Sequence, residues 1–276
     1  MIIDHEESAG PQQCPIEVLN DSSNSLIPHV LVSHPKSDEP DSTANRTNPT
    51  LYPPPNNRDD EGYLALKEGA LYYVEGMRLL SSEKTSESIA CFQAAEIMYL
   101  HAASRSNIQS FANLGYLYHY DRCAGAYFNS VDPSKAESPS EALISAVLEL
   151  GADERAYYCF LHAARRGHAE SCYMLGDLAS SGKGCQKDEK TAFEYYMRAH
   201  DLSLKYDSVI WGNAAVRIAM CYERGIGCQK DLNEAHAWYA RAIKGLDSST
   251  HTNGRGKSKM LDAAKNGMKR VEQRLS

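Results

Sequence analysis

The sequence lacks three features that mark well-defined classes of protein. No apolar run approaches the roughly 18 residues that a membrane-spanning helix needs. The first ten residues, MIIDHEESAG, have neither the basic start nor the apolar centre of a secretory signal. No two of the eight cysteines have the C-x-x-C spacing of zinc and redox sites. We therefore expect a cytoplasmic protein with free thiols, no membrane contact and no metal site.

Motifs of the common enzyme classes are also missing. The sequence contains no H-E-x-x-H, no G-x-S-x-G and no phosphate-binding glycine loop. Residues 182–184 and 225–227 hold paired glycines, but no strand pattern precedes them and no third spaced glycine follows, which indicates turns. His101 and His162 occupy equivalent positions, and we expect both on a solvated helix face. We expect no cofactor and no enzymatic activity.

Basic charge is scarce and unevenly placed. Residues 1–60 hold nine of the eleven prolines and carry a net charge of −7, which equals that of the whole chain, so residues 61–276 are neutral. A neutral folded part gives nucleic acid no electrostatic footprint. Because residues 1–60 are rich in Ser, Asn, Asp and Pro, we expect a disordered acidic tail. Its apolar clusters at 16–19 and 26–32 are open to two interpretations, a docking motif or an incidental cluster.

The rest of the chain is dominated by an internal repeat. The 21 residues from Ala95 (AEIMYLHAASRSNIQSFANLG) and the 21 from Ala156 (AYYCFLHAARRGHAESCYMLG) agree at nine positions. GKGCQKD at Gly182 and GIGCQKD at Gly225 differ at one residue and lie 43 residues apart. A period between about 20 and 50 residues is typical of stacked supersecondary units.

One unit has the pattern of two helices joined by a turn. The first helix ends near Gly182, because glycine can take the positive φ that terminates a helix. The second begins after Asp188, a candidate N-cap. The first helix carries Ser171, Leu175 and Leu178, and the second presents one apolar stripe of Ala192, Tyr195, Tyr196 and Ala199. A single hairpin cannot bury both stripes, so we expect hairpins to stack in series.

This pattern resembles the Sel1-like repeat, a relative of the tetratricopeptide repeat. The matching residues of the best unit are Gly167, Ala169, Leu175, Gly176, Gly182, Gly184, Asp188, Ala192, Tyr195 and Tyr196. The resemblance covers about residues 90–246, and residues 63–94 look like a degenerate first hairpin. It implies an all-α solenoid of stacked hairpins over residues 61–250 that acts as a scaffold or adaptor for other proteins.

Three segments depart from the repeat. Residues 121–153 form an insert, because the first repeat step is 61 residues, and we expect a loop followed by a short helix over about 139–150. The linker at 202–213 is seven residues longer than its counterpart. Residues 256–276 are expected to form a capping helix, with a short dimerising coiled coil as the alternative. Its apolar stripe consists of Leu261, Ala264, Met268, Val271 and Leu275.

The repeat pattern predicts one binding surface. The inner faces of the first helices should form a concave groove for a partner protein or peptide. The expected groove residues are Asn113, Tyr116, His119, Tyr120, Met174, Asp177, Ser181, Arg217, Met220 and Glu223. The sequence identifies neither the partner nor the oligomeric state.

Two other interpretations stay open. One is a ligand-binding or enzyme-like role for the insert, around Cys123 and Tyr127. The other comes from an exported branch of the family that resembles β-lactamases and has one disulfide in each repeat. Cys172 matches one cysteine of that pair, but Ala164 stands at the other position. Cys185 and Cys228, in equivalent loops, are expected to be small buried side chains.

We predict that all eight cysteines are free thiols, because no repeat has the paired spacing of the exported branch. Rapid alkylation of denatured protein prepared without reductant should count eight. A count of six or fewer would indicate disulfide bonds and would revive the exported, hydrolase-like interpretation.

Overall fold

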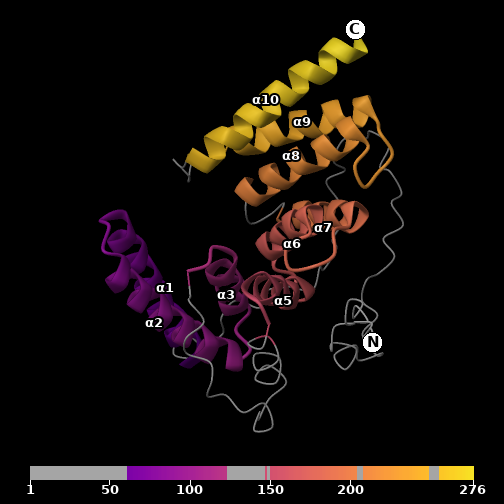
Figure 1. Ribbon diagram of the computed structural model, residues 1–276. Helices are drawn as coiled ribbons and strands as arrows, with labels where there is room; N and C mark the ends of the chain where they lie inside the picture. The colour runs from indigo at the N-terminus through magenta and orange to yellow at the C-terminus, as the bar shows by residue number, and fades with distance from the viewer. Residues whose placement is uncertain (1–60, 123–146, 148–149, 204–207, 249–254) are drawn as a thin grey trace, which may run out of the picture. The chain divides into compact units, whose positions relative to one another are not determined.

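The computed structural model describes residues 61–122, 147, 150–203, 208–248 and 255–276. Within these ranges every regular element is an α-helix (Figure 1). The prediction of an all-α solenoid of helical hairpins is therefore confirmed. The expected disordered tail, residues 1–60, lies outside the described residues. So does the expected insert helix at 139–150, apart from Val147 and Leu150.

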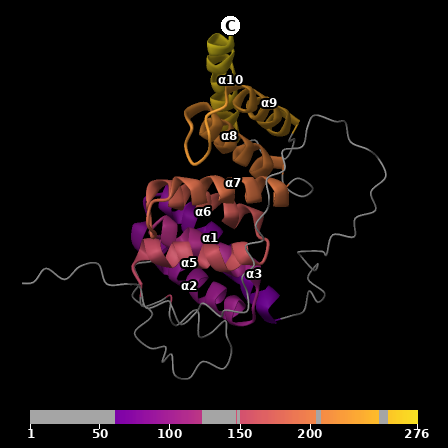
Figure 2. The same cartoon turned by 90° about the vertical axis from the view of Figure 1, so that its right-hand side faces the viewer.

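The helices pair into consecutive hairpins. The pairs are α1 (Glu61–Ser81) with α2 (Thr85–Ser104), α3 (Ile108–His119) with α5 (Ala152–Arg165), α6 (Ala169–Ser181) with α7 (Glu189–Ser203), and α8 (Ser208–Arg224) with α9 (Leu232–Ser248). We call the first helix of each pair an A helix and the second a B helix. Each later A helix also packs on the B helix before it, so the hairpins follow one another in chain order (Figures 1 and 2).

The B helices α7 and α9 begin where an aspartate caps them. The Oδ1 atom of Asp188 accepts hydrogen bonds from the backbone N–H groups of Lys190 (2.9 Å) and Thr191 (3.1 Å). Asp231 caps α9 in the same way. These bonds satisfy N–H groups that have no partner inside a helix. The prediction that Asp188 is an N-cap is confirmed.

The Gly-x-Gly loops after α6 and α8 fix how one hairpin sits on another. Their four glycines have φ between 66° and 73°, where a side chain is strained. A Cβ atom on Gly184 would lie 2.0 Å from the backbone oxygen of Asp153, in the first turn of α5. A Cβ atom on Gly227 would lie 2.1 Å from that of Glu189, which begins α7. Each loop therefore packs directly on the B helix of the preceding hairpin.

The first three hairpins are closed by an aromatic ring of the B helix that lies on a glycine of the A helix. The pairs are Gly76 with Phe92, Gly115 with Phe160, and Gly176 with Tyr196. A Cβ atom at these glycines would come within 2.8, 2.7 and 2.4 Å of the ring, respectively. Real Cβ atoms do not approach so closely, so the bare backbone is what lets the two helices meet.

Helix α1 also has a seven-residue period, which is shorter than the period of the helical hairpins. Its sequence reads EGYLALK, EGALYYV and EGMRLLS, three consecutive groups of seven. Gly62, Gly69 and Gly76 are all buried. The ring of Tyr99 lies on Gly69 and the ring of Phe92 lies on Gly76, so the glycine stripe faces α2.

The last helix, α10 (Arg255–Leu275), packs on α9 and α8. The ring of Tyr239 lies on its Gly267. Within its apolar stripe, Ala264 and Val271 are fully buried, whereas Leu275 is 47% exposed. We propose that α10 caps the fourth hairpin; the domain boundaries at 60, 250 and 256 stay predictions.

The expectation of a long linker at 202–213 is wrong, because most of these residues belong to helices α7 and α8. Helix α7 continues to Ser203, and α8 already begins at Ser208. Ile210 is buried and Gly212 lies against Leu246 of α9, so the first turns of α8 gain packing that the repeat comparison did not reveal.

We predict that Gly176→Ala lowers the free energy of unfolding by about 1–3 kcal/mol, because the new methyl group meets the Tyr196 ring. The helix preference of alanine alone would raise it by about 1 kcal/mol. The control is the reverse exchange at the equivalent position, Ala219→Gly, which should cost about 1 kcal/mol. Urea denaturation measures both. A Gly176→Ala protein more stable than the wild type would disprove the contact.

Candidate functional site

The predicted groove residues lie along the A helices, and two of them, Asp177 and Arg217, bond to each other across helices. The Nη2 atom of Arg217, on α8, lies 3.0 Å from Oδ2 of Asp177, on α6. Its Nε atom lies 3.3 Å from the hydroxyl of Tyr173. The hydroxyl of Tyr196, on α7, donates to the other oxygen of Asp177 at 2.7 Å. One carboxylate thus joins α6, α7 and α8.

A similar set of groups recurs one step further along the chain. The carboxylate of Glu223, on α8, accepts hydrogen bonds from the Tyr239 hydroxyl (2.7 Å), from Arg270 (3.0 and 3.1 Å) and from Arg274 (3.4 Å). Burial would raise the pKa of Glu223, but the bonds to Arg270 and Tyr239 and the nearby arginine charges hold it below its ordinary value. Glu223 therefore stays ionised.

Two expected groove residues do not reach the surface. Glu223 is 3% exposed, because α10 covers the position where an open groove was expected. Met174 is 7% exposed and belongs to the core between the second and third hairpins. The prediction that Glu223 and Met174 face a partner is therefore wrong, because both side chains are buried.

Helix α3 contributes an aromatic cluster. The Tyr116 hydroxyl donates to Glu170 at 2.7 Å, and its ring meets Phe160 edge-on with centroids 5.1 Å apart. Tyr120 stacks on Tyr116, 6.1 Å between centroids and 8° from parallel, and is 53% exposed. His119 meets Tyr120 edge-on at 4.9 Å. Burial raises the pKa of Tyr116 and lowers the pKa of His119, so both are neutral near pH 7.

The remaining groove residues are spread over three A helices. Asn113 is half-buried and accepts a hydrogen bond from Gln109 at 3.1 Å. Met220 is half-buried, and Ser181 is exposed at the end of α6. Among the predicted groove residues, the structure brings together two groups. Tyr120 contacts the rings of Tyr116 and His119, and Arg217 forms an ion pair with Asp177.

His168, which the sequence analysis did not single out, ties α6 to α3. Its Nδ1 atom accepts a hydrogen bond from the backbone N–H of Ser171 at 3.1 Å and so caps α6. Because Nδ1 accepts, Nε2 carries the proton and donates to Gln109 at 3.2 Å. Burial lowers the pKa of His168 to about 4. Asn107 caps α3 at the equivalent position, which is the signal that could have identified this cap.

The two equivalent histidines differ in their surroundings. His101 is exposed, as expected. His162 is half-buried, and its ring centroid lies 4.0 Å from that of Phe111. Burial and the charge of Arg166 lower its pKa to about 4. The expected solvated position is therefore wrong for His162, because α3 packs over it.

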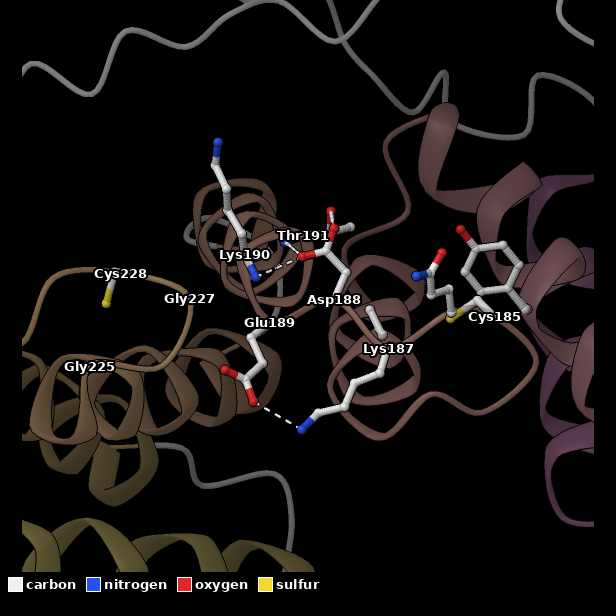
Figure 3. A pocket seen from close by; sticks show the side chains of 12 residues that line it. Cys185, Lys187, Asp188, Glu189, Lys190, Thr191, Gly225, Gly227 and Cys228 are labelled. Carbon is white, nitrogen blue, oxygen red and sulfur yellow. Dashed lines mark hydrogen bonds and ion pairs between the residues drawn. The ribbon is translucent and has the colours of Figure 1, made fainter.

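A cavity of about 960 Å³ opens between the two Gly-x-Gly-Cys loops (Figure 3). Cys185 and Cys228 are half-buried at its wall, less enclosed than expected. Burial raises the pKa of both thiols, that of Cys228 to about 11, so they are protonated at neutral pH. Lys187 pairs with Glu189 at 2.9 Å (Figure 3). The Thr191 hydroxyl donates to Asp188 at 2.7 Å, but this bond belongs to the cap of α7, and we assign no chemistry to this cavity.

All six cysteines in the described ranges are free thiols. Cys123 and Tyr127, around which the enzyme-like alternative was built, lie outside those ranges. Among the described side chains, no group of three or more His, Cys, Asp and Glu could hold a metal ion. None of the described helices combines the length and the apolar character needed to cross a membrane.

Stacked helical hairpins with repeated Gly-x-Gly loops define an α-helical solenoid. Within this class, the family model described as Sel1 repeat matches residues 152–168, 169–202 and 212–245. Residues 152–202 and 212–245 therefore consist of Sel1 repeats, which agrees with the resemblance seen in the sequence. Sel1 repeats are generally protein–protein interaction modules, and the fold is typically a non-catalytic scaffold.

Several solved structures are similar to the chain, and two of them come from Oxalobacter formigenes and Escherichia coli. A Sel1 repeat protein from Oxalobacter formigenes is 17% identical with a TM-score of 0.40, over 71% of this chain and 85% of the other. The second is c5321, a protective antigen of uropathogenic Escherichia coli strains that displays an SLR fold. It is 17% identical with a TM-score of 0.31, over 76% of this chain and 47% of the other.

We predict that the free energy of unfolding falls as the pH drops from 6.5 to 4, in part because of His168. In this window the unfolded chain protonates His168, whereas the folded protein, with a pKa of about 4, does not. His168→Asn keeps a capping side chain and should remove about 3 kcal/mol of this pH dependence. Urea denaturation at a series of pH values measures it. Equal pH dependence in both proteins would contradict the assignment.

Proposed function

We propose that the protein is a non-enzymatic scaffold that binds a partner protein or peptide along its A helices. The observation that carries this proposal is Tyr120, whose ring is 53% exposed at the end of α3. Exposed aromatic rings cost free energy in water and are common anchors of protein interfaces.

The neighbours of Tyr120 hold its ring in place before any partner arrives. Tyr116 stacks on one face, His119 meets its edge, and the guanidinium carbon of Arg122 lies 5.9 Å from its centroid. Tyr116 is itself fixed by its bond to Glu170 on α6. An anchor that is already ordered loses little conformational entropy on binding, which favours affinity.

The other groove residues either hold the A helices together or lie beside the proposed binding surface. Asp177 and Arg217 are already bonded to each other, so they hold the A helices in register. Substituting Tyr116 or Arg217 would break bonds between helices and should destabilise the fold. Asn113, Ser181 and Met220, which share the A helices, are proposed to border the bound segment.

Charge and cysteine chemistry support the class of partner and the compartment that we propose. A neutral repeat region supports a protein partner and not nucleic acid. Burial raises the pKa of Cys172 and Cys221 to about 12, so these thiols stay protonated at neutral pH. The free thiols at the described cysteines support a reducing compartment such as the cytoplasm.

We predict that Tyr120→Ala weakens partner binding at least about tenfold, because it removes an aromatic anchor. The matched control is Leu275→Ala, which trims another exposed apolar side chain (47%) on α10. Both proteins should keep wild-type helicity by circular dichroism. Affinity capture with the full chain should lose its partners only with Tyr120→Ala. Capture that is equal for both variants would refute the proposed surface.

A further inference from the structure

Helix α1 carries most of the exposed large apolar side chains that the structure describes. Eight large apolar side chains are exposed among the described residues, and five of them belong to α1. Leu64 is 52% exposed, and Leu71 and Val74 are each 65% exposed. The other two are Tyr72 and Met77, each 37% exposed. Soluble proteins rarely leave such a concentration of apolar surface uncovered without an interaction to make.

Three of these side chains, Leu64, Leu71 and Val74, follow the spacing of a coiled-coil seam. Leu64, Lys67, Leu71, Val74 and Arg78 are separated by 3, 4, 3 and 4 residues, and we call them the outer stripe. A spacing of this kind keeps one face of a helix against a second helix. On the opposite side of α1, the glycines of the same seven-residue period pack against α2. No helix among the described residues packs against the outer stripe.

We propose that the outer stripe binds the outer stripe of a second copy, so that the chain forms an antiparallel α1–α1 dimer. A two-fold contact needs only one self-complementary patch, and Leu71 lies at the centre of this one. In an antiparallel pair centred on Leu71, Lys67 of each copy approaches Glu75 of the other, because both lie four residues from the centre. A parallel pair would instead set Lys67 against Lys67 and Arg78 against Arg78.

The size of the stripe agrees with a reversible dimer. Helix α1 has 21 residues, so it is about 31 Å long, and one face of it can bury about 500 Å² per copy. The total of about 1,000 Å² stands at the lower bound of specific interfaces. We therefore expect a dimer that dissociates on dilution.

The other candidate for self-association is already occupied. The sequence left open a coiled coil through residues 257–275, but Ala264 and Val271 of that stripe are buried against the fourth hairpin. The apolar stripe that stays available is at the opposite end of the array, on α1.

Sedimentation velocity of the full chain, from low to high micromolar concentration, tests the proposal. The wild type should shift from monomer to dimer. Leu71→Lys combined with Val74→Lys should raise the dissociation constant at least about tenfold, because charged side chains would replace the apolar contacts at the centre of the dimer. The control is Leu275→Lys, which makes the same change at a 47% exposed leucine on α10 and should dimerise like the wild type. Circular dichroism should show all three helical.

Charge exchange tests the orientation. Lys67→Glu alone and Glu75→Lys alone should each weaken the dimer, and the double variant should restore it. A wild type that stays monomeric, a dimer that survives both lysines on α1, or a double variant weaker than either single one would overturn the proposal. This outcome is independent of partner capture through Tyr120.

Discussion

The architecture depends on aromatic rings that lie on bare helical backbone. In the first three hairpins a ring of the B helix occupies the space that a Cβ atom of the A helix would need, as with Tyr196 on Gly176. The fourth hairpin has Ala219 at that position, and there the ring of Tyr239 lies on Gly267 of α10 instead. Because a glycine costs about 1 kcal/mol in a helix interior, its use here is repaid only by the close packing that it permits.

Close packing brings the polar ends of these rings to carboxylates on the A helices. Tyr196 reaches Asp177 and Tyr239 reaches Glu223, and each carboxylate then receives an arginine from the following helix. The A helices are therefore linked by bonds that are internally satisfied. Groups that are already bonded to each other offer little free energy for binding a partner. That free energy has to come from side chains that the A helices leave exposed. Tyr120 is such a group, which is why the proposed function rests on it.

Local signals that repeat in tandem made the fold predictable from sequence. The Gly-x-Gly loops and the cap at Asp188 each depend on a few neighbouring residues, so pattern alone identifies them. The candidate site depends on contacts between distant residues, such as Arg270 with Glu223, and pattern does not reveal these. Glu223 and Met174 were assigned to the groove by helical position, but tertiary packing buries both. The heptads of α1 are visible in the sequence, but their seven-residue period is shorter than the 20–50 residues that are typical of stacked hairpins.

The central claim is that a partner lies against Tyr120. It is tested most directly by placing a photo-crosslinking amino acid, such as benzoylphenylalanine, at position 120 in one protein and at position 74 in another. Illumination of the full chain in its native extract should attach the partner at position 120. Position 74, on α1, should yield only adducts with a second copy. Partner adducts that are absent at 120, or equally abundant at both positions, would contradict the account.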